Sequence, residues 1–191
     1  MLRLFTALPV PPEVAQSLLY LQRDLPGASW RPAENFHITL CFFGELSREA
    51  ARDLDDLLGR IVPPAFDIAV EGTGWFGRRE PSAVWARIRE TGELTGLAAS
   101  CARAARRLGI ALERQSYLPH ITLAYCHGTQ LEDARAWTER HQRYSSPSWQ
   151  ATHFHLYSSR SRASGASRYI PEADYPLAGP FEGLAGPEQG Y

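Results

Sequence analysis

The sequence predicts an α+β fold, in which helices pack on antiparallel sheets. Two observations support this class. Strand-like and helix-like segments follow one another in no regular order, and the strict strand–helix–strand rhythm of a parallel sheet is missing. We expect one domain over residues 1–178, followed by a loose tail over residues 179–191 that contains four Gly and two Pro.

Seven segments are predicted to form strands, because they are rich in β-branched and aromatic residues and are bounded by turn residues. The clearest one reads Phe-His-Ile-Thr-Leu-Cys-Phe-Phe. A Gly- and Pro-containing turn predicts that two of the strands form a hairpin. The predicted strands cover residues 2–8, 36–43, 66–76, 83–89, 120–126, 149–158 and 168–177.

Four other segments show the apolar periodicity of amphipathic helices. Ser47 stands where it can cap the second helix, and Gly109 ends the third. The spacing from Thr129 to Glu132 matches a capping box before the fourth. The predicted helices cover roughly residues 11–25, 47–61, 92–108 and 131–141.

The 191 residues carry 20 basic and 21 acidic side chains, and every basic one is Arg. The absence of Lys excludes enzymes that use a Schiff-base Lys, P-loop nucleotidases and ligases that form a lysyl-adenylate. A net charge of −1 argues against nonspecific coating of nucleic acid, which needs a basic surface. A local cleft lined by Arg is compatible with this balance.

Cysteine content and hydropathy bear on the compartment. The three cysteines are odd in number and form no C-x-x-C pair, so reduced thiols are expected rather than disulfides or a zinc knuckle. We expect no signal peptide, because the apolar stretch at the start is too short, and the sequence contains no run of 18 apolar residues. We expect a cytoplasmic monomer that does not associate with membranes.

The tetrapeptide His-Ile-Thr-Leu occurs twice, at residues 37–40 and 120–123. An aromatic residue stands at the sixth position of each copy, Phe42 and Tyr125. The residue frequencies predict about 0.03 copies of H-x-T-L by chance. Two copies with matching neighbours therefore require a common cause.

Alternate side chains of a strand share a face, so each repeat places an imidazole beside a hydroxyl over an apolar back. The pairs are His37 with Thr39 and His120 with Thr122. Strict alternation turns Phe42 and Tyr125 toward the apolar face. We favour core positions for these two aromatics, and contact with a nucleobase is the alternative.

Two facing His–Thr pairs suit phosphate chemistry. One imidazole removes a proton from a nucleophile, the other gives a proton to a leaving oxygen, and the hydroxyls hold the phosphoryl group. Structural coincidence and a metal-binding pair are the alternatives. Too few Cys, Asp or Glu stand at useful spacing to complete a metal site, so we expect no metal and no cofactor.

With these motifs, the sequence resembles the two-histidine (2H) phosphoesterase superfamily, whose signature is two H-x-[ST]-h motifs in which h is apolar. Within it, the sequence is similar to the LigT-like RNA 2′,3′-cyclic phosphodiesterases, long called 2′-5′ RNA ligases. The resemblance covers about residues 1–177. Its flanking stretches are residues 3–9, 30–37, 42–44, 117–120, 154–160 and 168–169.

The resemblance implies a bilobal, pseudo-twofold fold in which two antiparallel sheets flank a central cleft and helices pack outside. It implies metal-independent hydrolysis of a terminal RNA 2′,3′-cyclic phosphate to a 2′-phosphate, with weak reverse ligation. Carried over, His37 is the acid for the 3′ oxygen and His120 the base for water. Thr39 and Thr122 bind the phosphate.

The sequence departs from the family at Tyr125, where family members often carry Arg. Tyr125 can stack on a base but brings no charge, so phosphate affinity or base preference would differ. Arg160, in a Ser- and Gly-rich stretch, is a further candidate for RNA contact. For His153 and His155 we favour a solvated surface.

Two other functions remain open. The chain could be a non-enzymatic module that binds an AMP-like nucleotide, although two intact motifs argue against this. It could also be a phosphodiesterase whose substrate is a small cyclic nucleotide, because the near-neutral charge gives only modest support for binding long RNA.

Overall fold

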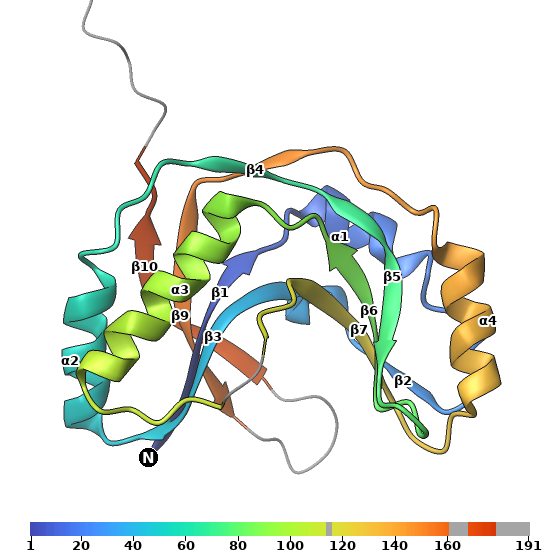
Figure 1. Cartoon of the computed structure of the whole chain (residues 1–191), viewed down its shortest axis with the longest axis horizontal. Coiled ribbons are helices and arrows are strands. Elements are labelled where there is room, and N and C mark those ends of the chain that lie inside the picture. Colours follow the sequence, from blue (N-terminus) through green and yellow to red (C-terminus); the bar gives the residue numbers. More distant parts are fainter. Residues whose placement is uncertain (114–115, 161–167, 179–191) are drawn as a thin grey trace, which may run out of the picture.

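The computed structural model describes residues 1–113, 116–160 and 168–178, and this part of the chain forms an arch with two lobes (Figure 1). The strands are β1 (Leu2–Pro9), β2 (Ala28–Trp30), β3 (His37–Leu46), β4 (Phe66–Ile68), β5 (Val70–Phe76), β6 (Ala83–Ile88), β7 (His120–Cys126), β8 (Trp149–Ala151), β9 (His153–Arg160) and β10 (Arg168–Pro176). The helices are α1 (Pro12–Leu19), α2 (Arg48–Leu58), α3 (Gly92–Arg107) and α4 (Leu131–His141).

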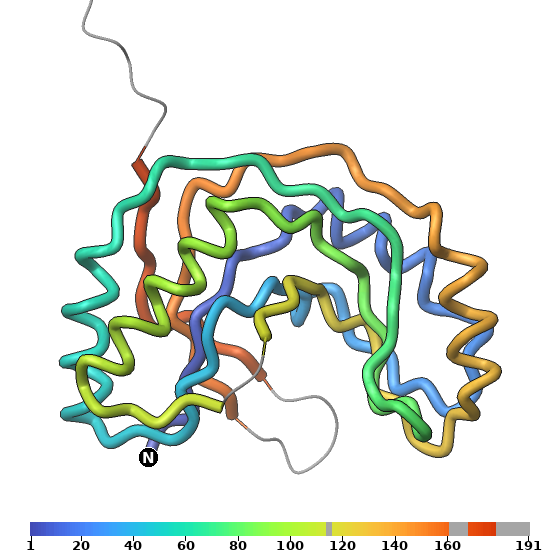
Figure 2. The backbone as a smooth tube through the Cα atoms, viewed as in Figure 1, coloured from blue at the N-terminus to red at the C-terminus, as the bar shows by residue number. Residues whose placement is uncertain are grey.

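Each lobe is built on a four-stranded antiparallel sheet. The strand orders are β10-β9-β1-β3 and β2-β7-β6-β5. The small β4–β8 sheet crosses the top of the arch, and the chain trace shows α2 and α3 on one lobe and α1 and α4 on the other (Figures 1 and 2). The predicted α+β class with two antiparallel sheets is confirmed.

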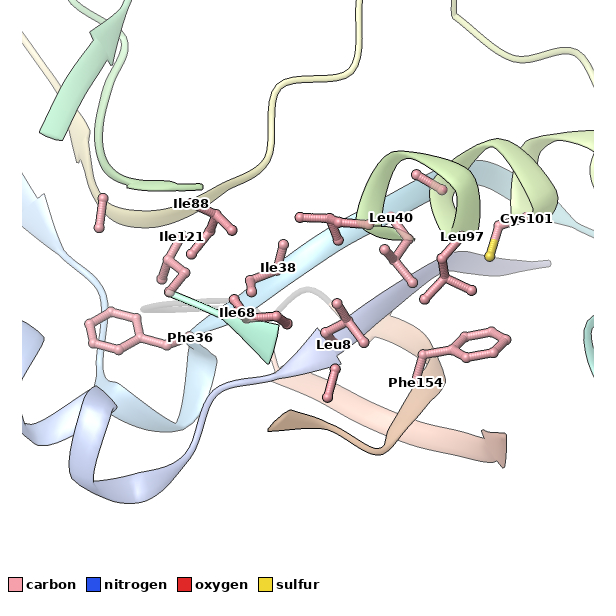
Figure 3. Close-up of a cluster of buried hydrophobic side chains, with 14 of the residues drawn as sticks. Leu8, Phe36, Ile38, Leu40, Ile68, Ile88, Leu97, Cys101, Ile121 and Phe154 are labelled. Atoms are coloured by element: carbon pink, nitrogen blue, oxygen red, sulfur yellow. The ribbon is translucent and has the colours of Figure 1, made fainter. Parts of the chain in front are cut away.

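The two strands that carry the repeat, β3 and β7, show the expected two-faced pattern. Ile38 and Ile121 are fully buried, whereas the His and Thr of each motif are partly exposed. Figure 3 shows Ile38 and Ile121 in one cluster with Ile68 and Ile88. The apolar backs of both strands therefore share one core, which holds the two polar faces in a constant relation.

Both strands also contain a β-bulge at the same position of the motif. At this position Leu40 of β3 has no partner on β1, and Leu123 of β7 has no partner on β6; β3 has a second bulge at Phe43. A bulge inserts one residue and so changes the face on which the following side chains lie. Phe42 and Tyr125 are accordingly 40% and 44% exposed. The prediction that they belong to the core is wrong, because it assumed unbroken alternation.

The helix caps agree with the sequence in one place and differ in another. Ser47 caps α2 as predicted, and Thr91 caps α3 in the same way. The predicted capping box of α4 is wrong, because Gln130 is the N-cap and caps with no side-chain hydrogen bond. Thr129 is buried, and its hydroxyl instead donates to the Pro26 carbonyl at 2.7 Å.

Two predicted strands are each divided. Ala69 separates β4 from β5, and Thr152 separates β8 from β9, so that the chain can leave the small sheet and enter a large one. The strand β2 has only three residues and was not predicted. It forms because Trp30 pairs with Ala124 of β7. The predicted tail, residues 179–191, lies outside the described residues.

Residues 72–77 read G-x-G-x-x-G, but they lie in β5 and in the turn that leads to β6 rather than before a helix. At Gly74 an added Cβ would stand 2.4 Å from the Trp85 indole. Gly77 has a positive φ of 98°. These glycines therefore permit close packing and a tight turn, and they do not form a phosphate-binding loop.

Within the described ranges, no helix is long and apolar enough to cross a membrane. Cys41, Cys101 and Cys126 are free thiols, and the last two are buried. Burial raises the pKa of Cys41 to about 11 and that of Cys101 to about 12, so both thiols are protonated at neutral pH.

Candidate active site

The polar faces of β3 and β7 meet at one cavity of about 480 Å³. His37 and Thr39 line it from the first sheet, and His120 and Thr122 line it from the second. The structure thus brings together the four residues predicted from the repeat. The other described residues of the lining are Arg3, Phe5, Arg31, Asn35, Phe42, Phe76, Ser82, Ala83, Tyr125, Ser159 and Tyr169.

Both imidazoles are held by the same backbone contact. His37 Nδ1 lies 2.8 Å from the Asn35 carbonyl oxygen, and His120 Nδ1 lies 2.7 Å from that of Leu118. A carbonyl oxygen only accepts hydrogen bonds, so each Nδ1 carries the proton. Each Nε2 is therefore left as the atom that can take a proton from a ligand or, once protonated, give one.

His37 sits in an aromatic setting. The Phe5 and Tyr169 rings lie 5.0 Å from its imidazole, centroid to centroid, the second edge-on. Burial lowers the pKa of His37 to about 4, against the effect of its bond to Asn35. The charges of His120 and Arg31 lower it further. His37 is therefore neutral at pH 7 in the unliganded protein.

His120 has aromatic neighbours of its own. Phe76 lies 4.9 Å from its ring in an edge-on arrangement, and Trp85 lies 5.8 Å away. Burial lowers the pKa of His120, and the hydrogen bond to the Leu118 carbonyl opposes this. Of the two pKa values, only that of His37 also responds to a nearby cation, Arg31.

An Arg guanidinium covers each of the two motif aromatics. Arg3 of β1 lies 5.0 Å above the Phe42 ring, and Arg31, just after β2, lies 5.3 Å above the Tyr125 ring. Each Arg comes from a strand next to the one that carries the aromatic, or from its end. The pseudo-symmetry of the two motifs therefore extends to a cation over each sixth-position ring.

Arg31 is buried, with 7% of its surface exposed. Its Nη2 donates to the Tyr169 hydroxyl at 3.3 Å, and its guanidinium lies 5.7 Å from the Tyr169 ring. Among the described residues it makes no ion pair with a carboxylate. Sequence reasoning assigned no role to Arg31 or Tyr169, although both stand in stretches that supported the family resemblance.

The charge of the cavity is one-sided. Its described lining contains two Arg and two His but no Asp, Glu or Cys. Such a lining attracts anions and adds no carboxylate or thiolate to the two imidazoles for holding a metal. A second cavity of about 360 Å³ extends toward α3 and shares Thr39, Phe42, Phe76 and His120 with the first.

Arg160, the candidate for RNA contact, does not lie with the residues that line the catalytic cavity. Arg160 is exposed at the end of β9 and is not part of the described lining, whereas the preceding Ser159 is. Strand alternation explains the difference, because successive side chains point to opposite faces. Phe42 and Tyr125, in contrast, do line the cavity.

Sequence comparison places the chain among known phosphoesterases. The family of LigT-like phosphoesterases matches residues 8–85 and 88–166. An RNA 2′,3′-cyclic phosphodiesterase of Escherichia coli is 33% identical over 174 residues, which cover 88% of this chain and 93% of that protein. The enzyme of that name from Archaeoglobus fulgidus is 32% identical over 126 residues, 64% of this chain and 71% of the relative.

Comparison with solved structures gives the same family relationship as the sequence matches. Escherichia coli LigT complexed with 3′-AMP superposes with a TM-score of 0.74 at 28% identity, covering 92% of this chain and 98% of that one. The protein TT0787 of Thermus thermophilus has a TM-score of 0.78 with 93% and 98% coverage, and at 24% identity it supports the fold alone. The family match covers most of the chain and includes both motifs, so the protein belongs to the LigT-like phosphoesterase family.

Proposed function

We propose that this protein hydrolyses the 2′,3′-cyclic phosphate at the end of an RNA to a 2′-phosphate. The observation that carries the proposal is the pairing of two H-x-T motifs on one cavity, each with its Nδ1 bound to a backbone carbonyl and its Nε2 without a hydrogen bond to the described residues. The relatives from E. coli and A. fulgidus carry the name of this activity.

The chemistry requires one base and one acid. In the proposed direction, His120 Nε2 takes a proton from water, whose oxygen attacks phosphorus. The bond from phosphorus to the 3′ oxygen breaks, and His37 Nε2 gives this oxygen a proton. The hydrogen bonds that hold the two Nδ1 atoms are equivalent, so they do not decide which histidine is the acid. In this proposal the acid is the histidine that lies on the side of the phosphate where the 3′ oxygen leaves.

The acid must be protonated when the substrate is bound, although burial keeps His37 neutral in the free protein. A bound phosphodiester can bring about the protonation that the acid needs. Its negative charge between the two imidazoles stabilises one imidazolium, and the positive charge of that imidazolium disfavours protonation of the other imidazole, which stays neutral as the base. The substrate thus assembles the charge state that its own hydrolysis needs.

Three groups are suited to hold the phosphate. The Thr39 and Thr122 hydroxyls can donate to its non-bridging oxygens, and they sit beside the two imidazoles. Arg31 supplies a positive charge that the described protein does not neutralise with a carboxylate. This charge stands over Tyr125, the position at which the family resemblance leads one to expect Arg.

The exposed rings of Phe42 and Tyr125 flank these groups and offer flat surfaces for nucleobases. A cavity of about 480 Å³ has the size of a site for a nucleotide. Solved structures of E. coli LigT are described as complexes with 3′-AMP, ATP and NADP+. A small cyclic nucleotide is therefore the second candidate substrate.

The test uses a short RNA with a 2′,3′-cyclic phosphate end, in parallel with a nucleoside 2′,3′-cyclic phosphate. We expect a 2′-phosphate product from the RNA, identified by mass spectrometry and by its resistance to a 3′-specific phosphatase. Faster turnover of the mononucleotide would move the assignment to small cyclic nucleotides. Tight nucleotide binding without turnover of either substrate would instead make the protein a binding module.

The reverse reaction can be measured with the same RNA and a second RNA that ends in a 5′-hydroxyl. Ligation must reopen the cyclic phosphate, because the chain has no Lys to form an adenylate. We expect a low yield of a 2′-5′ linkage that does not require ATP. An ATP-dependent product would contradict the proposed chemistry.

A further inference from the structure

Two histidines and a carboxylate lie together outside the catalytic cavity, on the outer strand pair of the first sheet. His153 and His155 share one face of β9, and Asp174 of β10 is the direct cross-strand partner of His155. One ligand atom from each residue lies within 4.8 Å of the other two. In residues 1–113, 116–160 and 168–178, no other His, Cys, Asp and Glu side chains form such a group.

His155 and Asp174 lie close together but are not aligned for a hydrogen bond. His155 Nδ1 lies 3.2 Å from Asp174 Oδ1, yet the orientation of the two groups leaves Nδ1 without a hydrogen-bond partner. Ligand atoms of tetrahedral zinc stand about 3.3 Å apart when the bonds are 2.0–2.1 Å long. The nitrogen and the oxygen thus already have the separation that a shared metal requires.

His153 is oriented for the same task. Its Nδ1 lies 3.0 Å from the Thr152 hydroxyl, which can accept a hydrogen bond from this nitrogen and leave the Nε2 lone pair free. Metal-binding histidines commonly donate their second nitrogen in this way. The His153 and His155 rings lie 4.8 Å apart, centroid to centroid, so the two imidazoles are direct neighbours on this strand face.

The backbone supports such a site, because β9 and β10 are joined by an antiparallel ladder from Arg160 to His153. A ladder fixes the relative positions of an i, i+2 pair and of a residue across from it. His155 Nδ1 is buried beneath its neighbours, whereas Asp174 is largely exposed and His153 is partly exposed, so an ion would reach the site from the side of Asp174.

We propose that His153, His155 and Asp174 bind a divalent transition metal, with zinc as the ion that best suits two imidazoles and one carboxylate. The fourth position stays open to water. The site is separate from the proposed hydrolysis, since none of its residues lines the catalytic cavity. A bound ion would cross-link β9 to β10, the edge strand that carries Tyr169, and so stabilise the folded protein.

Cobalt(II) is a suitable probe, because its visible absorption reports tetrahedral coordination. We expect one equivalent to bind the purified protein and to be displaced by zinc. The His155→Ala and Asp174→Asn variants should bind cobalt at least tenfold more weakly, whereas His127→Ala, at an exposed position, should match the unmodified protein. Zinc should raise the melting temperatures of the unmodified protein and of His127→Ala, but not those of His155→Ala and Asp174→Asn.

The His120→Ala variant separates this site from the catalytic pair, and it should keep the full cobalt spectrum. Loss of the spectrum in His120→Ala, its retention in both His155→Ala and Asp174→Asn, or the absence of saturable binding would overturn the proposal. Asp174→Asn keeps the shape of the side chain, so it stays informative if His155→Ala does not fold. Urea unfolding in EDTA checks the fold of every variant.

Discussion

The strands β3 and β7 carry the same four residues in the same geometry, yet they stand in different places. Each has a bulge after its Thr, a backbone carbonyl on its imidazole Nδ1 and an Arg over its sixth-position aromatic. However, β3 is the edge strand of its sheet, whereas β7 lies between β2 and β6. The repeated motif therefore determines how each His and Thr is held, whereas the position of each strand in its sheet determines which residues surround it.

The surroundings make the two histidines unequal. Tyr169 and Phe5 cover His37, and Arg31 adds a nearby positive charge, so its pKa falls to about 4. His120 also has a lowered pKa, but without such a cation among the causes. The comparison teaches that one duplicated motif can give two histidines with unequal pKa values, because burial and neighbouring charge differ between the two copies.

The largest effect should come from removing either imidazole. We expect His37→Ala and His120→Ala each to reduce kcat for the cyclic-phosphate RNA about 10³-fold, because each removes one partner of the acid–base pair. Turnover measured with excess enzyme gives the residual rates. The exposed His127 provides the matched control, and His127→Ala should keep full activity. Normal activity of either His37→Ala or His120→Ala would show that the two strands do not each supply a catalytic imidazole.

The next largest effect concerns the hydroxyls. Thr39→Val and Thr122→Val remove a donor from the cavity while keeping the shape of the side chain. We expect each to lower kcat about 10²-fold, because a donor aimed at developing negative charge acts mainly in the transition state. Steady-state kinetics would show this as a change in kcat rather than in KM. A change confined to KM would mean that the hydroxyl only helps to bind the substrate.

Acid should destabilise the protein through His37. The unfolded imidazole has a pKa near 6.5 and the folded one near 4, so between these values the unfolded chain binds a proton that the folded chain does not. Stability is then fully present above pH 6.5 and falls as the pH drops toward 4. From pH 7 to pH 5, the contribution of His37 amounts to a loss of about 2 kcal/mol.

Urea unfolding at pH 7 and pH 5 measures this difference. His37→Asn should lose less stability on acidification than the unmodified protein, because the titrating group is gone. His120→Asn should act in the same direction, since burial lowers the pKa of that group as well. Equal acid sensitivity of His37→Asn and the unmodified protein would show that His37 is not held neutral by the fold.

The smallest effect distinguishes the two arginines. Arg31→Gln should raise KM about tenfold, because it removes a buried, charged donor beside the phosphate site. It should also move the limb of the kcat/KM profile that reports His37 to higher pH, since Arg31 lowers the pKa of His37. Arg3→Gln, at an exposed position over Phe42, should change both quantities less. Equal effects of the two substitutions would contradict the special role of Arg31.

The sequence was sufficient for the parts of the site that depend on local order. His37, Thr39, His120 and Thr122 follow from a repeated tetrapeptide and the period of a strand, and the structure places all four on one cavity. Phe42 and Tyr125 were assigned to the wrong face, because one extra residue in the ladder is not visible in a pattern of alternating polarity.

Arg31, Tyr169 and the cluster of His153, His155 and Asp174 depend on contacts between distant segments. The hydrogen bond from Arg31 to Tyr169 joins residues 138 positions apart, and Asp174 reaches His155 only across a strand pair. No periodicity of the sequence encodes such distances. The first contact arises because the two large sheets face each other, with Arg31 just after β2 of one and Tyr169 on β10 of the other. The second arises because β10 pairs with β9.

The sequence by itself determined the class of chemistry. Two imidazole–hydroxyl pairs and the lack of Lys leave acid–base chemistry on a phosphate without a lysyl intermediate, because those properties belong to the residue types and their spacing. Only the tertiary structure decided that the charge of Arg31 acts on His37 and not on His120. A pKa depends on solvation and on neighbouring charge, and both are set by the segments that fold around each strand.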